Sequence, residues 1–72
     1  MYLSKGEYSQ FSLKGRVNLL KEFGTPINEK YIKEIKITIY LLYDFYVEVI
    51  YKNDSIIRVE PVKHVGMLHY YL

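Results

Sequence analysis

The chain has 72 residues, ten Lys and Arg against eight Asp and Glu, and no cysteine. This length fits one domain over residues 1–72, disulfides and Cys-ligated zinc are excluded, and a net charge of +2 indicates neither a nucleic-acid nor a membrane partner. Nine tyrosines and no alanine favour a β-sheet, and so short a chain buries only about 60% of its extended surface. Its core is therefore thin and depends on tight packing or on burial against another chain.

The first 24 residues predict two helical segments. Ser4 followed three residues later by Glu7 is a capping-box pattern, and the nearby Gly6 limits this segment to a turn or two. Ser12 is the N-cap of a longer helix, whose apolar residues repeat at helical spacing: Leu13, Val17, Leu20 and Phe23. Gly24 and Pro26 end that helix.

After Pro26 the hydrophobic period changes to two, which predicts β-strands. The predicted strands cover residues 27–31, 34–42, 45–52 and 56–60. A tight turn at Tyr43 and Asp44 joins the middle two strands, and residues 53–55 have turn chemistry. Pro61 ends the last strand or places it at the edge of the sheet.

The tail, residues 63–72, carries Val65, Leu68 and Leu72 at a spacing of three or four, which predicts a short C-terminal helix. The predicted fold is therefore α+β. An N-terminal helix packs on a three- or four-stranded antiparallel β-meander, and a short C-terminal helix closes onto the sheet. We expect the apolar stripe of the N-terminal helix to cover one face of this sheet.

The second face of the predicted sheet is too apolar to be left wholly to water. One explanation is that another helix or the N-terminal turn covers it, and the other is that it contacts a second molecule, since large apolar patches mark interfaces. The second explanation predicts an interaction surface of five residues: Tyr40, Leu42, Tyr46, Ile50 and Tyr51.

Several stretches of the chain resemble a family of short, uncharacterised bacterial proteins. The matching stretches are Gly24-Thr25 at the helix end, Ile39-Tyr40-Leu41, the strand at residues 45–51 and the terminal Tyr71-Leu72. The chain departs from the family at Tyr43-Asp44, where an Asp-Gly turn is usual, and at Ile50, where Trp is usual. The resemblance implies the helix-plus-meander layout and a free-standing small protein, but no activity, ligand or catalytic residue.

Catalytic and metal-binding patterns are missing from the sequence. His64 and His69 are five residues apart, so on a helix they would diverge by about 140° and would not share a face. No Gly-x-Ser-x-Gly elbow, cysteine nucleophile or phosphate loop is present. Glu48 lies within an aromatic strand, and we expect it to pair across strands with Lys36 or Arg58. We therefore predict no catalytic, cofactor-binding or metal-binding residues, and no enzyme activity.

A nucleic-acid platform is the alternative function. It would place aromatic and basic residues on one sheet face, where bases stack: Tyr40, Tyr46, Lys36, Lys52 and Arg58. Asp44 has the wrong sign for the basic residue that precedes an RNP1-type strand, and Glu48 and Glu60 dilute the positive field.

The leading hypothesis is a non-enzymatic protein–protein interaction or regulatory module. It would self-associate, or bind another protein, through an aromatic sheet face or a sheet edge. The chain shows no signal-peptide h-region, and its longest apolar stretch, residues 37–43, is far below the roughly 20 residues of a membrane helix. We therefore expect a cytoplasmic protein with no membrane partner.

Overall fold

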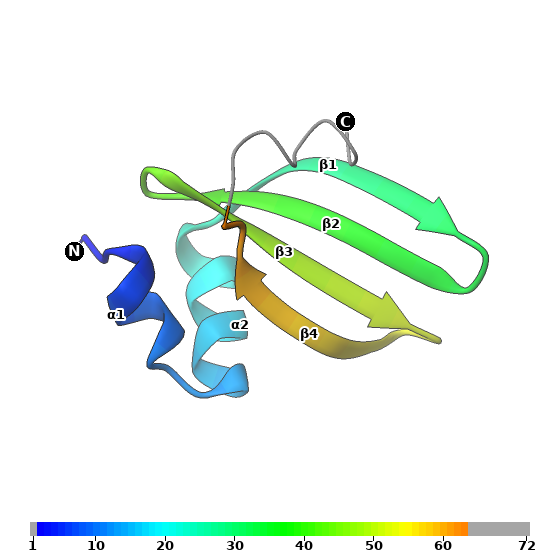
Figure 1. The fold of residues 1–72 in the computed structure, drawn as a ribbon, viewed down its shortest axis with the longest axis horizontal. Helices are drawn as coiled ribbons and strands as arrows, with labels where there is room; N and C mark the ends of the chain where they lie inside the picture. Colours follow the sequence, from blue (N-terminus) through cyan, green and yellow to red (C-terminus); the bar gives the residue numbers. More distant parts are fainter. Residues whose placement is uncertain (1, 64–72) are drawn as a thin grey trace.

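The computed structural model describes residues 2–63 and shows two helices beside one sheet (Figure 1). Its elements in chain order are α1 (Lys5–Ser9), α2 (Leu13–Phe23), β1 (Thr25–Ile32), β2 (Ile35–Leu42), β3 (Phe45–Lys52) and β4 (Ser55–Pro61). The strands pair antiparallel in the order β1-β2-β3-β4. The α+β class and the four-stranded meander are confirmed. The predicted C-terminal helix falls on residues 64–72, which lie outside the described residues.

Both helices begin at the serines that the sequence indicates. At α1, the Ser4 Oγ accepts a hydrogen bond from the Glu7 N–H at 3.2 Å, and the Glu7 Oε1 accepts one from the Ser4 N–H at 3.0 Å. This reciprocal pair satisfies two of the backbone donors that a helix start leaves open. At α2, the Ser12 Oγ accepts from the Gly15 N–H at 3.1 Å.

Gly24 lets β1 follow α2 without a connecting loop. Its φ of −83° is not in the left-handed region, so its backbone conformation does not require glycine. A Cβ at this position would lie 2.8 Å from the Leu20 carbonyl oxygen and 3.1 Å from the Leu20 Cδ2. The glycine is needed because β1 leaves the helix in close contact with its last turn.

The β2–β3 hairpin has a two-residue turn. Leu42 pairs with Phe45, so Tyr43 and Asp44 form the turn as predicted, and Tyr43 has a positive φ of 56°. The Tyr43 ring stacks on Phe23 at a centroid distance of 6.1 Å, which ties the turn to the end of α2. The Tyr2 hydroxyl donates a hydrogen bond to the Asp44 carboxylate and adds the start of the chain to the same corner.

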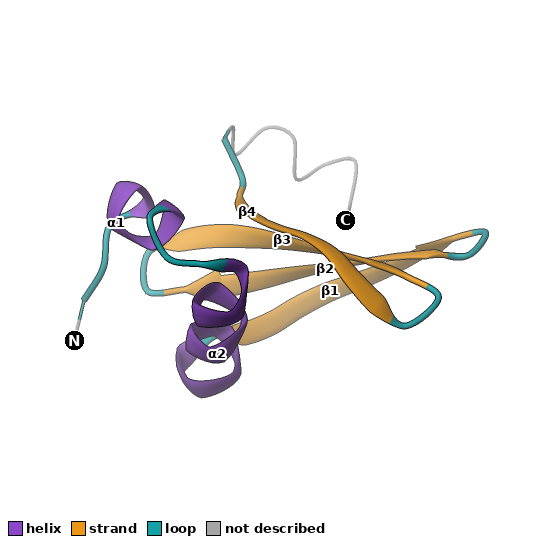
Figure 2. Ribbon diagram, turned by 90° about the horizontal axis from the view of Figure 1, so that it is seen from below, coloured by secondary structure: helices purple, strands orange, loops and turns teal. Residues whose placement is uncertain are grey.

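Both helices lie on the same side of the sheet (Figure 2), and the main core lies between them and the strands. Its buried residues are Leu3, Tyr8, Leu19, Leu20, Leu42, Phe45, Val47, Val49 and Val59. The Tyr8 hydroxyl donates to the Arg16 carbonyl oxygen at 2.9 Å, and the Arg16 Nη1 donates to the Val59 carbonyl oxygen at 2.5 Å. These bonds connect α1 to α2 and α2 to β4.

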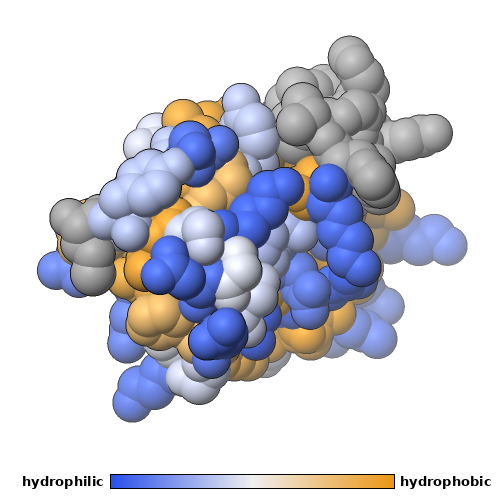
Figure 3. Space-filling view, turned by 60° about the vertical axis from the view of Figure 1, so that its left-hand side comes forward, coloured by the Kyte–Doolittle hydropathy of each residue, from blue (hydrophilic) through white to orange (hydrophobic). Residues whose placement is uncertain are grey.

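The buried side of α2 differs from the predicted stripe. Leu20 is buried and Val17 packs on the core, but Leu13 and Phe23 are each 44% exposed, and Leu19 is buried instead. Tyr8 of α1 and Leu19 belong to the same buried cluster, so the buried side of α2 includes a residue beside the predicted stripe. Hydrophobic residues therefore show between hydrophilic ones at the end of the molecule where the helices lie (Figure 3). Within residues 2–63, neither helix has the length and apolar character needed to cross a membrane.

Candidate interaction surface

The strand register divides the predicted interaction residues between the two faces of the sheet. Leu42 pairs with Phe45, and Tyr40 pairs with Val47, so both lie on the side that carries the helices, and Tyr51 follows on the same side. Leu41 pairs with Tyr46 and Ile37 with Ile50, which places Tyr46 and Ile50 on the opposite face. The prediction that Tyr40 and Leu42 share a face with Tyr46 and Ile50 is wrong, because a two-residue turn keeps the residues on either side of it facing the same way.

The face opposite the helices is not an open surface. Ile39 is fully buried there, and the neighbouring Ile37, Leu41, Tyr46 and Ile50 are half-buried. Glu48 lies on this face with its side chain 12% exposed, and its Oε1 is 4.0 Å from the Arg58 Nε. Of the two partners predicted for Glu48, the structure therefore shows Arg58.

On the helix side, the cover that α2 gives the sheet decreases away from the β2–β3 turn: Thr38 is 4% exposed, whereas Tyr31 is 67% exposed. The helix runs across the strands instead of along them, and the strands extend well past it (Figure 1). An α-helix is about 10 Å wide, whereas a strand of eight residues is about 26 Å long, so one crossing helix cannot cover its full length. We call the part of this face beyond the centre of the helix the far half, defined by Glu29, Tyr31, Lys36, Tyr40, Tyr51 and Ile56. Glu29 and Tyr31 are exposed there, whereas Tyr40, Tyr51 and Ile56 are partly buried at the margin of the core.

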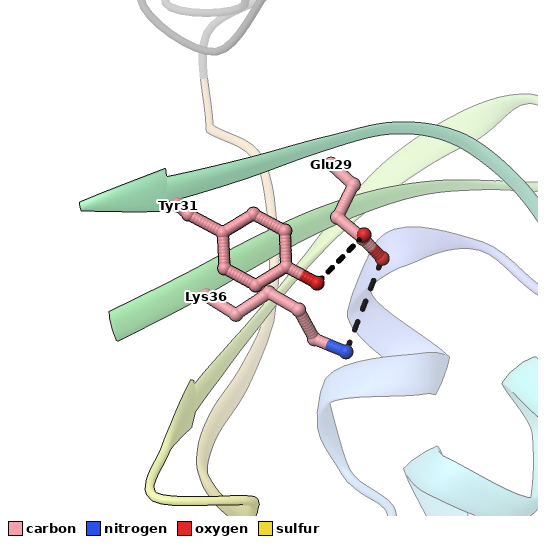
Figure 4. Close-up of polar contacts among 3 residues, drawn as sticks. All are labelled: Glu29, Tyr31 and Lys36. Carbon is pink, nitrogen blue, oxygen red and sulfur yellow. Dashed lines mark hydrogen bonds and ion pairs between the residues drawn. The ribbon is translucent and has the colours of Figure 1, made fainter. Parts of the chain in front are cut away.

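Three residues of the far half form a polar cluster that joins β1 to β2 (Figure 4). Tyr31 pairs with Lys36 across the two strands, and Glu29 precedes Tyr31 by two residues, so all three lie on one side. The Tyr31 hydroxyl donates to the Glu29 Oε1 at 3.0 Å, and the Lys36 Nζ is 3.9 Å from the Glu29 Oε2. The Lys36 Nζ also lies 4.4 Å from the centroid of the Tyr51 ring, which is within cation–π distance.

Two phenols of the far half, those of Tyr31 and Tyr40, have a pKa above that of free tyrosine. The hydrogen bond to Glu29 is the main cause that raises the pKa of Tyr31, and the positive charge of Lys36 opposes it in part. Burial is the main cause that raises the pKa of Tyr40. Tyr51 raises it further, through electrostatic repulsion and through a hydrogen bond between the two side chains. At neutral pH these phenols are therefore uncharged, and they act as hydrogen-bonding and aromatic contact groups.

β1 is the most exposed strand and forms one edge of the sheet. Three of its large hydrophobic side chains are exposed: Ile27 at 42%, Tyr31 at 67% and Ile32 at 49%. The sequence-based prediction names a sheet edge as one contact surface, but its interaction residues include none from this strand. The proximity of Tyr31 and Lys36 could be inferred only from the β1–β2 register, which places these two residues opposite each other.

The predicted nucleic-acid platform is also divided by the register. Tyr40 and Lys36 lie on the helix side, whereas Tyr46, Lys52 and Arg58 lie on the opposite side. The Lys36 ammonium lies over the Tyr51 ring, so that face of the ring is already covered and cannot stack on a base. The expected arrangement of aromatic and basic residues on one face is therefore wrong.

Residues 2–63 contain no group of three His, Cys, Asp or Glu side chains placed to hold a metal ion. His64 and His69, which the sequence analysis considered as ligands, lie outside the described residues. No protein-family model, curated protein or solved structure matches the chain. The resemblance to a family of short bacterial proteins therefore stays a prediction.

Proposed function

We propose that this chain is a non-enzymatic protein-interaction module that self-associates through β1. The observation that carries the proposal is the exposure of Ile27, Tyr31 and Ile32 on the outer strand of the sheet. Outer strands pair readily with another chain, because backbone hydrogen bonds give affinity and the side chains give specificity. Pairing of β1 with β1 of a second copy about a two-fold axis would extend the sheet and cover part of Tyr31 and Ile32.

The irregularities at both sheet edges support a closed dimer over an open fibre. The register of β1 shifts between Pro26 and Asn28, which leaves the second half of the strand, ending at Ile32, as the regular part. On the other edge, the pairing of β4 shifts beside Ile50 and Tyr51, and the strand ends at Pro61. Bulges and prolines of this kind discourage further edge pairing.

A binding role is further supported by the state of the phenols. A general base needs a pKa near the working pH, whereas the environments of Tyr31 and Tyr40 raise the pKa of both away from neutrality. The exposed aromatic ring of Tyr31 is suited to an interface, where tyrosine is enriched because it has an apolar body and a polar tip.

Sedimentation velocity between low micromolar and millimolar concentration tests the proposal. We expect the sedimentation coefficient of the wild type to rise with concentration, and Ile32→Lys to abolish the rise because a charge at β1 opposes pairing. Ile57→Lys is the matched control, since Ile57 is 56% exposed on the other outer strand, β4.

Two results would refute self-association through β1. One is a wild type that stays monomeric over the whole range. The other is a rise in sedimentation coefficient that Ile57→Lys abolishes and Ile32→Lys leaves intact, which would move the interface to β4.

A further inference from the structure

A shallow cleft lies where α2 meets the far half of the sheet. Its walls are mostly apolar and aromatic, formed by Val17, Leu20, Tyr40, Val49, Tyr51 and Ile56. Its volume is about 50 Å³. That is several times the roughly 10–15 Å³ that one water molecule needs, and about a third of the roughly 150 Å³ of a cavity known to bind benzene. The cleft therefore fits a branched aliphatic group better than an aromatic ring.

One cation stands at the wall of this cleft. Lys21 lines it from α2, and its side chain is exposed. Within the described part of the chain, neither ion pair involves Lys21. Lys36, the cation of the far half, is by contrast engaged by Glu29 and by the Tyr51 ring. Lys21 is thus a positive charge beside an apolar opening, a combination that is complementary to an aliphatic group with a carboxylate close to it.

We propose that this cleft binds an acidic segment of a partner protein through one branched aliphatic side chain, whose neighbouring carboxylate pairs with Lys21. The proposal rests on the interaction function above but uses a different surface, since Lys21 and Ile56 line the cleft and Ile32 does not. Burial of the aliphatic group against Val17 and Tyr51 supplies the attraction. The charge of Lys21 selects acidic over basic partners, because a like charge at that wall is repelled.

Isocaproate is the simplest probe of this chemistry, because it combines a branched aliphatic chain with a carboxylate. In spectra of the ¹⁵N-labelled protein, we expect saturable shifts of the Val17, Lys21 and Tyr51 amides, with a dissociation constant on the order of 10 mM for so small a ligand. Isoamylamine, which reverses the charge, and acetate, which lacks the branched chain, should each bind roughly tenfold more weakly or not at all.

Two lysine variants separate the proposed contact from a general effect of charge. Lys21→Glu is expected to weaken isocaproate binding by roughly tenfold, and the milder Lys21→Gln to weaken it less, while both keep a helix-forming residue at an exposed position. Lys52→Glu makes the same charge change at an exposed position on the opposite face of the sheet and should leave binding unchanged.

The proposal is overturned if isocaproate shifts no amide of the cleft, if isoamylamine or acetate binds equally well, or if Lys21→Glu and Lys21→Gln have no effect. Shifts of Lys21 and Tyr51 on dilution without any probe would show that a second copy occupies the cleft, which also overturns it. The two proposals can fail separately. If isocaproate does not bind but the wild type self-associates and Ile32→Lys abolishes that association, only the cleft proposal is refuted and the proposed function is retained.

Discussion

The two halves of the helix side of the sheet are built from the same strands but have different surroundings. The part of this face beneath the helices, which we call the near half, comprises Leu42, Phe45 and Val47, and all three are buried. In the far half, Tyr31 and Lys36 face solvent and are held by polar contacts. The difference follows from the direction of α2, because a helix that crosses a sheet shields only the part of each strand below it.

The side chains of the two halves match these surroundings. The near half uses aliphatic residues and phenylalanine, with Tyr8 buried and its hydroxyl bonded to the Arg16 carbonyl oxygen. The far half uses tyrosine and lysine, whose long apolar bodies cover the sheet while their polar ends reach water. One half of this face is therefore part of the core, and the other half presents polar groups to solvent.

The largest loss of stability is expected when a core side chain between α2 and the sheet is shortened. Leu20→Ala should lower the free energy of unfolding by about 2–5 kcal/mol, because Leu20 is 4% exposed and the change leaves a cavity in a thin core. Urea denaturation followed by circular dichroism measures this loss. Leu13→Ala, at a 44% exposed position of the same helix, is the control and should cost less than about 1 kcal/mol.

Gly24→Ala tests the junction between α2 and β1. The added Cβ would meet the Leu20 carbonyl oxygen at 2.8 Å, so we expect a loss of about 1–3 kcal/mol in the free energy of unfolding. Gly6→Ala is the matched control, since the nearest atom to a Cβ at Gly6 is the Ser4 Oγ at 3.9 Å. Equal stabilities of the two variants would show that β1 does not leave α2 as closely as described.

High pH should weaken the near half through Tyr8. Burial raises the pKa of Tyr8 well above its usual value, and the charge of Arg16 opposes this in part. The folded chain therefore retains a proton that the unfolded chain releases from about pH 10, and stability that is complete below that pH falls above it, by at most about 1.4 kcal/mol per pH unit. Urea denaturation from about pH 8 to about pH 11 measures the slope.

Tyr8→Phe identifies the source of that alkaline slope. The variant keeps the ring and loses the hydroxyl, so its stability should be about 1 kcal/mol lower at neutral pH but should fall less steeply above about pH 10. A slope that is unchanged in Tyr8→Phe would assign the alkaline loss to other tyrosines, such as Tyr40.

The smallest effect on stability is expected in the far half. Glu29→Gln removes the ion pair with Lys36, and because both side chains are partly exposed the cost should be below about 1 kcal/mol. The pKa of Tyr31 should fall toward its usual value, since Glu29 is the main cause that raises it. Urea denaturation and an NMR titration of the Tyr31 ring measure the two effects. A loss as large as that of Leu20→Ala would contradict the division into two halves.

Local patterns in the sequence predict the elements of this fold well. The caps at Ser4 and Ser12, the turn at Tyr43 and Asp44, and the strand at residues 45–52 all follow from short-range chemistry that neighbouring residues decide. Hydrophobic period likewise separates the helices from the strands, because it reports which side of each element is apolar.

The arrangement of those elements could not be predicted in the same way. The predicted two-residue turn already implies that Leu42 and Phe45 share a face, so the assignment of Tyr46 and Ile50 to the face of Leu42 is an error of reasoning. Which of the two faces packs against the helices does not follow from the turn. The crossing direction of α2, which leaves Tyr31 exposed, depends on contacts between residues far apart in the sequence, such as the hydrogen bond from Arg16 to the Val59 carbonyl oxygen. The hydrophobic period predicts neither the face of the sheet that packs against the helices nor the crossing direction of α2.

The most direct test of the account is a dilution series of amide spectra, from millimolar to low micromolar concentration. It asks whether the exposed strand beside the far half, and not the helix-covered core, makes contact with a second copy. We predict shifts confined to the second half of β1, centred on Tyr31 and Ile32. Spectra that do not change with concentration, or shifts centred on β4 around Ile57, would contradict the account.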